Sequence, residues 1–123
     1  MKPKFTPGEN IAVKVPPHEF DQTVLFYKTI LGLEQIGRSS SESIESVTFK
    51  FGCKKLWVDK VSGISQAEIW LEVMTDNIEA ASKYFEKTRC IRRDEIEPLP
   101  KGFSGFWISS PSNIIHLITD ENT

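Results

Sequence analysis

The chain has few cysteines, and their arrangement does not indicate a metal or redox function. It contains only Cys53 and Cys90, and these stand in no Cys-x-x-Cys pair. Zinc and thiol-redox motifs use such pairs, and a disulfide framework uses more cysteines. Both cysteines are therefore predicted to be small buried apolar side chains, in a protein of a reducing compartment.

The sequence also lacks an excess of positive charge and any long apolar run. Fifteen Lys and Arg residues face 17 Asp and Glu, for a formal net charge of -2. This balance disfavours nucleic acid and anionic membranes as partners. No segment approaches the roughly 18 apolar residues of a spanning helix, and the N-terminus has no apolar segment of the signal-peptide kind. We expect a cytoplasmic protein.

The chain does contain an internal repeat. Residues 10–15 align with residues 68–73 after a shift of 58 positions, and the same shift places Phe26-Tyr27 on Tyr84-Phe85. Apolar and aromatic positions that recur in one order at one spacing indicate a duplicated supersecondary unit. A chain of 123 residues can bury one core. We therefore predict a single domain over 1–123, with modules at about 8–60 and 67–120.

Each module is predicted to contain a strand, a helix and three further strands. Ile11, Val13 and Val15 alternate with polar or small residues, which is typical of a half-buried strand. Helical spacing of apolar side chains follows, and Gly32 stands where a left-handed cap would end the helix. We expect strands over 10–15, 34–38, 46–51, 56–60, 68–73, 90–95, 103–109 and 114–119, and helices over 18–31 and 77–88.

The buried side of each helix follows from the same periodicity. Phe20 and Tyr27 should pack between the first helix and its sheet, and Ile78 and Phe85 should do so in the second module. The spacing of Asp76 and Glu79 resembles a capping box at the start of the second helix. His18, at the start of the first helix, is predicted to be a surface residue.

At this point the sequence resembles a known family. Residues 10–32, with the alternating strand, Phe26-Tyr27 and the glycine at the helix end, resemble the opening module of the vicinal oxygen chelate superfamily. That superfamily includes glyoxalase I, extradiol dioxygenases and bleomycin-resistance proteins. Residues 106–117 are similar to its closing hairpin, in which an Asp-Pro-x-Gly-Asn turn leads to a strand bearing a glutamate.

The resemblance implies an α+β fold in which two tandem βαβββ modules form a curved mixed sheet around a concave cavity. It also implies a homodimer. Alternation along the strands predicts that Asn10, Ala12 and Lys14 face this cavity, as do Glu68, Trp70 and Glu72.

Superfamily members that bind a divalent metal use up to four cavity positions. Residues 56–58 align with 115–117 when one extra residue of offset is allowed, and the four positions then read Asn10, Trp57, Glu68 and His116. Trp57 cannot ligate a metal, and its bulk fills the space of a carboxylate. Glu68 and His116 are competent ligands and Asn10 is a weak one, so a minimal site remains chemically possible.

Two functions stay open at this stage. In the first, the cavity binds a small organic molecule without a metal, and Trp57 and Trp70 stack on it beside Asn10, Glu68 and His116. In the second, the protein is a lyase, isomerase or dioxygenase that uses one Zn, Ni, Fe or Mn ion held by Glu68, His116 and Asn10, with Glu68 as candidate base. A plain alternative is that Glu68 and His116 form a buried hydrogen-bonded pair. Trp57 at a ligand position favours the first function.

Overall fold

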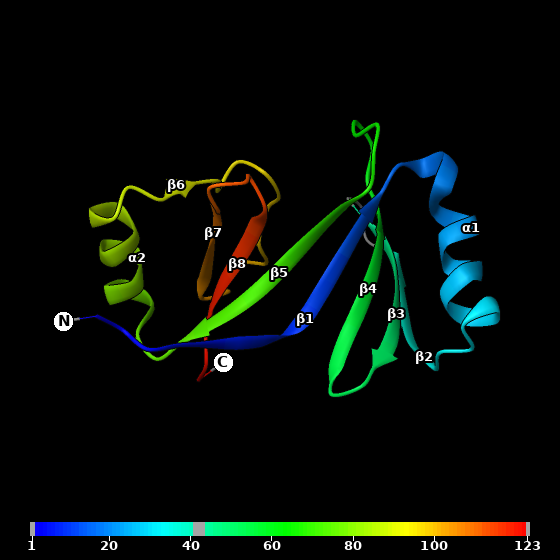
Figure 1. The fold of residues 1–123 in the computed structure, drawn as a ribbon, viewed down its shortest axis with the longest axis horizontal. Helices are drawn as coiled ribbons and strands as arrows, with labels where there is room; N and C mark the ends of the chain where they lie inside the picture. The colour runs from blue at the N-terminus through cyan, green and yellow to red at the C-terminus, as the bar shows by residue number, and fades with distance from the viewer. Residues whose placement is uncertain (1, 41–43, 123) are drawn as a thin grey trace. The chain divides into compact units, whose positions relative to one another are not determined.

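The computed structural model describes residues 2–40 and 44–122. The chain forms two compact units (Figure 1). Unit 2 comprises residues 9–70, and unit 1 combines the residues up to Gly8 with those from Leu71 onward. Strands β1 (Phe5–Val15) and β5 (Glu68–Thr75) each contribute residues to both units.

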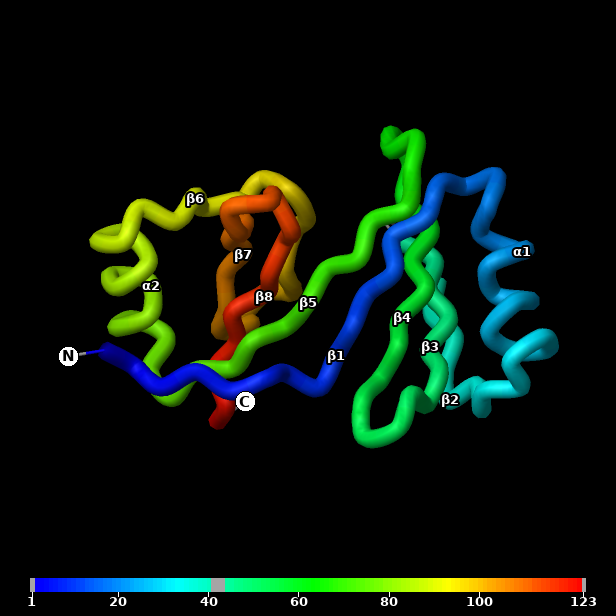
Figure 2. Tube along the Cα trace, in the orientation of Figure 1, coloured from blue at the N-terminus to red at the C-terminus, as the bar shows by residue number. Residues whose placement is uncertain are grey.

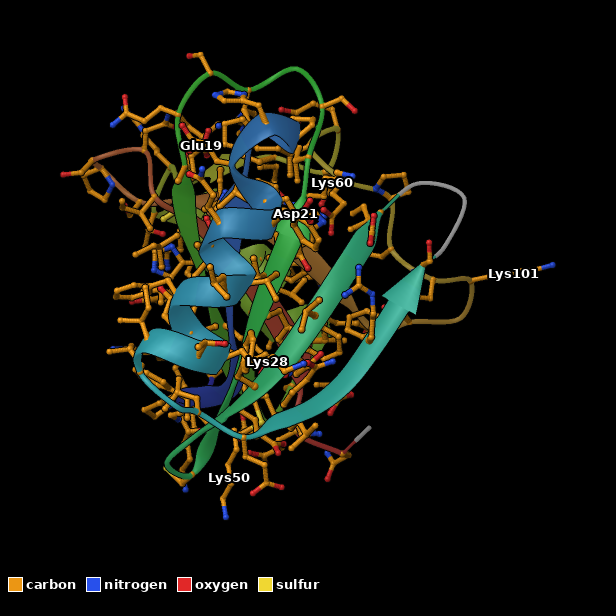
Figure 3. The ribbon with its side chains drawn as sticks, turned by 90° about the vertical axis from the view of Figure 1, so that its right-hand side faces the viewer. Glu19, Asp21, Lys28, Lys50, Lys60 and Lys101 are labelled. Carbon is orange, nitrogen blue, oxygen red and sulfur yellow. The ribbon has the colours of Figure 1, made fainter. Side chains whose placement is uncertain are left out.

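Unit 2 contains the first copy of the repeat. After β1 come a 3-10 turn (Pro17–Glu19), helix α1 (Phe20–Leu25) and a π-helical turn (Phe26–Ile30), followed by β2 (Gln35–Ser40), β3 (Glu45–Phe51) and β4 (Lys54–Lys60). The strand order is β2-β3-β4-β1, in which the β1–β4 pair is parallel and the β2–β3 and β3–β4 pairs are antiparallel. Figure 3 views this unit with α1 in front of the sheet. Residues 41–43, between the predicted strands 34–38 and 46–51, lie outside the described residues.

The core of unit 2 lies between α1 and one face of this sheet. It consists of buried side chains from the helix and from strands β1, β3 and β4: Val13, Val15, Phe20, Val47, Phe49, Leu56 and Val58. Ile11, Val24 and Tyr27 pack against it as well. The predicted alternation of the first strand is thus confirmed, because its odd-numbered residues carry the core. Gly32 has φ +72°, which matches the predicted left-handed stop.

Unit 1 repeats the same order of elements. Helix α2 (Ile78–Lys87) follows β5, and β6 (Ile91–Arg92), β7 (Gly105–Ser109) and β8 (Ile115–Asp120) complete the sheet. Their order is β5-β8-β7-β6, with β5 and β8 parallel. The path of the chain through these strands can be followed in Figure 2. Buried Ala81, Phe106, Ile108 and Ile118 form the core, and Phe5, Val73, Ile78 and Phe85 pack on it. The α+β class and the two βαβββ modules are confirmed.

Some local predictions are wrong for identifiable reasons. The cap of α2 is Asn77, whose side chain accepts a hydrogen bond from the Ala80 amide at 3.0 Å. Asp76 instead accepts from the backbone N–H of Lys4 at 2.9 Å, so its side chain is engaged outside the helix. Cys53 is exposed because it lies in the turn between β3 and β4. His18 is exposed, as predicted.

The strand that opens the chain is longer than its alternation indicated. It begins at Phe5, five residues before the predicted start, although Pro7 and Gly8 interrupt the pattern. By contrast, the strand predicted over 90–95 is only two residues long. Within residues 2–40 and 44–122, no helix is long and apolar enough to cross a membrane.

Candidate functional site

The face of the unit 2 sheet opposite α1 carries charged and aromatic side chains. Strands β1 and β4 pair in parallel, with Ala12 opposite Trp57 and Lys14 opposite Asp59. Because Val13 and Val58 of the same pair point into the α1 core, alternation turns these residues to the other face. Asn10, Ala12 and Lys14 were predicted to face away from the helix, and this is the sheet face on which their strand positions place them.

A buried ion pair lies at the centre of this face. Lys14 Nζ is 2.7 Å from Asp59 Oδ2, and the two side chains are 3% and 9% exposed. The second carboxylate oxygen of Asp59 accepts a hydrogen bond from the Ser46 hydroxyl, donated from the neighbouring strand β3. A charge removed from water is costly unless it is paired and hydrogen-bonded. Asp59 therefore satisfies two buried groups at once.

Trp70 extends this network at the end of unit 2. The Lys14 ammonium lies 4.3 Å from the centroid of the Trp70 ring, within the range of a cation–π interaction. The indole N–H donates to Glu68 Oε1 at 3.0 Å. Trp70 is 7% exposed, whereas Glu68 is exposed. The ring is thus fixed at its edge by Glu68 and on its face by Lys14.

Trp57 is held in a similar way by a side chain of the adjacent strand. Its indole N–H donates to Asn10 Oδ1 at 2.7 Å. Asn10 and Trp57 are both partly buried, so the ring is oriented but retains exposed surface. A tryptophan whose polar edge is satisfied internally offers its apolar face to a ligand.

His116 lies elsewhere, because the offset used to align it carries one residue too many. The register places His116 opposite Leu71 and opposite Ile108. Val58 stands opposite Val13 in unit 2, which is the same arrangement 58 positions earlier. His116 therefore corresponds to Val58, and it shares the α2 side of the unit 1 sheet with Ile108 and Ile118. A one-residue shift moves every side chain of a strand to the opposite face.

The structure thus brings four predicted residues together in two hydrogen-bonded pairs within unit 2, Asn10 with Trp57 and Glu68 with Trp70. His116 belongs to unit 1. The two candidate metal ligands of unit 2 are engaged with the tryptophans, because Asn10 Oδ1 and Glu68 Oε1 each accept an indole N–H group. Among the described residues, no three His, Cys, Asp or Glu side chains gather in a way that could hold an ion.

The sequence interpretation did not single out Asp59 and Ser46. A signal for them existed, since Asp59 has the same strand parity as Trp57 and Lys14 was already expected on that face. A lysine on the inward side of a strand requires a carboxylate partner. Once the β1–β4 register is known, Asp59 is the carboxylate directly opposite Lys14.

Comparison with protein-family models finds no match, and comparison with curated proteins likewise finds none. Solved structures do match. A hypothetical protein from Bacillus halodurans C-125 superposes with a TM-score of 0.70 at 12% identity, over 95% of this chain and 94% of the other. The Mn(II)-bound glyoxalase from Novosphingobium aromaticivorans gives a TM-score of 0.67 at 18% identity, over 97% of this chain and 40% of the glyoxalase.

An epimerase structure is similar to the same degree. A Streptomyces coelicolor methylmalonyl-CoA epimerase in complex with 2-nitronate-propionyl-CoA gives a TM-score of 0.66 at 13% identity, over 95% of each chain. These identities are low, so the likeness establishes the fold and leaves the activity open. The chain has the same fold as these glyoxalase and epimerase structures, which is the fold that the sequence resemblance predicted.

Proposed function

We propose that this protein binds a small organic molecule on the sheet face of unit 2 opposite α1, without a metal ion. Trp57 supplies a stacking surface, Asn10 and Trp70 border it, and Glu68 accepts a hydrogen bond from the ligand. The buried Lys14–Asp59 pair is a positioning element that fixes the Trp70 ring. His116 is left out of this site because of its place on the α2 side of unit 1.

The observation that carries the proposal is the internal fixation of both indoles. Each N–H is bonded to a side chain of the same face, at 2.7 Å in one case and 3.0 Å in the other. An aromatic ring that is already fixed before binding loses little conformational entropy when the ligand binds, which lowers the entropic cost of binding. Glu68 accepts the indole N–H through Oε1, and its exposed carboxylate can accept a further hydrogen bond.

A thermal-shift screen of small aromatic and cationic compounds tests this proposal. A ligand that binds only the folded state raises the melting temperature by mass action. The shift should persist when EDTA is present and should be lost in Trp57→Ala. A matched control is Trp107→Phe, because the Trp107 indole donates to the Glu97 carbonyl in unit 1 and is 5% exposed. Hits that require a divalent ion would reject the metal-free proposal.

The second candidate is a divalent-metal enzyme, and the likeness to a Mn(II)-bound glyoxalase favours it. Glu68 and Asn10 are the unit 2 donors that such an ion would use, with Glu68 also the candidate base and His116 the third ligand of the sequence hypothesis. Each of them accepts an indole N–H in the present arrangement, so an ion would share Asn10 Oδ1 with the Trp57 indole and would bind Glu68 through Oε2, the oxygen that the Trp70 indole does not contact.

Metal analysis separates the two candidates. We expect no stoichiometric divalent ion in the purified protein, and no change in metal content for His116→Ala. Elemental analysis by mass spectrometry after incubation with Mn, Fe, Ni or Zn salts provides the measurement. A stoichiometric ion that disappears in both His116→Ala and Glu68→Ala would establish the enzyme candidate instead.

We further infer a cytoplasmic homodimer. Four large apolar side chains of the α1 region are more than two-fifths exposed: Leu25, Phe26, Ile30 and Leu31. Large exposed apolar side chains that gather on one helical segment are typical of an interaction site. Two free cysteines suit a reducing compartment. Light scattering on the eluting protein should give twice the monomer mass of 14.0 kDa, and a monomeric mass would reject the dimer.

A further inference from the structure

Unit 1 contains an apolar cleft on the α2 side of its sheet. Its volume is about 340 Å³. Apolar side chains from the helix and the strands form the walls, among them Phe5, Val73, Phe85, Ile108 and Ile118. Polar groups in the lining come from His116, Ser109 and Ser110, and from Lys2 and Cys90. The size is at the lower end of small-molecule sites, which run from roughly 300 to 1,000 Å³.

The corresponding region of unit 2 is filled, and the strand registers show why. There Phe49 stands opposite Leu56, and Val47 stands opposite Val58. Phe49 and Val58 are fully buried beneath α1, and the Phe49 ring packs 5.9 Å from that of Tyr27.

In unit 1 the matching pairs are Ser110 with Ile114 and Ile108 with His116. A serine therefore takes the place of the core phenylalanine, and a histidine takes the place of the core valine. Loss of a buried aromatic ring leaves a void unless the surroundings collapse. Phe85 does not fill it, since its ring packs against Phe106 at 6.1 Å and Phe5 at 5.2 Å.

The imidazole of His116 gives the cleft a defined hydrogen-bonding group. Nδ1 lies 3.0 Å from the carbonyl oxygen of Ile114, which can only accept, so Nδ1 carries the proton. In the neutral ring the other nitrogen, Nε2, is then an acceptor. No protein donor for Nε2 exists among residues 2–40 and 44–122. A ligand that carries one O–H group next to an apolar body matches this arrangement.

We propose that the α2 cleft of unit 1 is a second ligand site, which takes a single-ring phenol. The ring lies against Phe85, Ile108 and Ile118, where aromatic and aliphatic contacts stabilise it. The hydroxyl donates to His116 Nε2. This site uses no residue of unit 2, so it stands or falls independently of the function proposed above.

Titration of the isotope-labelled full chain with phenol, followed by NMR, tests this site. Toluene is the matched probe, because a methyl group replaces the hydroxyl on the same ring. Phenol should shift the His116 ring signals and the methyl signals of Ile108 and Ile118, and it should bind about fivefold or more tightly than toluene. Equal affinities, or phenol shifts confined to other residues, would overturn the proposal.

Two variants separate the cleft from nonspecific binding. Ser110→Phe restores the side chain found at this position in unit 2 and should abolish binding of both probes. The same substitution at Ser112, an exposed turn residue, should leave binding unchanged. Should Ser110→Phe fail to fold, His116→Leu decides, since it should weaken phenol about fivefold and leave toluene unaffected. An unchanged preference for phenol in His116→Leu would overturn the assigned hydrogen bond.

Discussion

Lys14 and Asp59 form a buried ion pair across the parallel strands β1 and β4, with Nζ 2.7 Å from Oδ2. The same lysine lies over the Trp70 ring at 4.3 Å. The Lys14–Asp59 pair thus joins β1 to β4, and it also holds the Trp70 ring of the proposed ligand site in position. The two charges depend on each other, because both side chains are almost fully removed from water.

Removal of one partner should be far more harmful than removal of both. Asp59→Asn removes the carboxylate charge that Lys14 Nζ contacts at 2.7 Å inside the protein, and it should lower the free energy of unfolding by about 3–5 kcal/mol. The double variant Lys14→Met with Asp59→Leu should recover most of this loss. Urea denaturation provides the measurement.

An exposed pair serves as the control for this experiment. Lys55 Nζ lies 3.8 Å from Glu9 Oε1, and both side chains are about half exposed. Lys55→Gln should change the stability by less than about 1 kcal/mol. If Asp59→Asn were equally mild, the pair would be accessible to water and its positioning role would be wrong.

Gly8 marks a point where two strands of unit 1 approach closely. A Cβ at this position would lie 2.6 Å from the Cβ of Glu72 and 2.4 Å from its Cγ. Gly8→Ala should therefore force a shift and destabilise the protein by about 1–3 kcal/mol. Gly37→Ala is the control, since the nearest atom would be 3.8 Å away. Equal thermal stability of the two variants would contradict this packing.

The Arg38–Glu45 pair predicts a pH dependence. The hydrogen bond from Arg38 lowers the pKa of Glu45 below its ordinary value of 4.5. A carboxyl with a lowered pKa stabilises the fold fully above its unfolded pKa, and this contribution disappears as the pH falls through the folded value.

Glu45→Gln tests this dependence. The variant should melt below the parent protein at pH 7, and the two curves should converge below pH 4.5 as Glu45 protonates. Thermal melts across that range provide the comparison. A difference that stays constant down to the most acidic pH would show that the loss comes from packing and not from charge.

Trp57→Ala should weaken binding of a screened ligand by more than about 1 kcal/mol, the scale of one aromatic contact. Titration calorimetry measures the affinity directly. Asn10→Ala should have a smaller effect in the same direction, because it frees the indole edge and lets the ring move. A ligand whose affinity is the same for Trp57→Ala and the parent protein binds elsewhere.

Much of the fold could be predicted from the sequence because its signals are local. Alternation in residues 10–15 identified Val13 and Val15 as core residues, and helical spacing did so for Phe20. The position of His116 could not be predicted this way. Its face depends on how β8 pairs with β5, and one extra residue of offset inverts the answer.

Strand parity could place Lys14 and Asp59 on one face, but it could not pair them before the register was known. Lys14 and Asp59 are distant in the sequence, and only the parallel pairing of β1 with β4 makes them neighbours. Strand parity assigned Asn10, Glu68 and Trp70 to one face, and the family resemblance assigned Trp57. The hydrogen bonds of Trp57 with Asn10 and of Trp70 with Glu68 add detail that no pattern contained.

The indole N–H signals of the three tryptophans give the most direct measurement of the proposed function. Each signal reports one ring, so a 15N-resolved titration with a screened ligand in the presence of EDTA locates the site. We predict that the Trp57 and Trp70 signals shift together and that the Trp107 signal does not. A titration in which neither Trp57 nor Trp70 responds would contradict the proposed site.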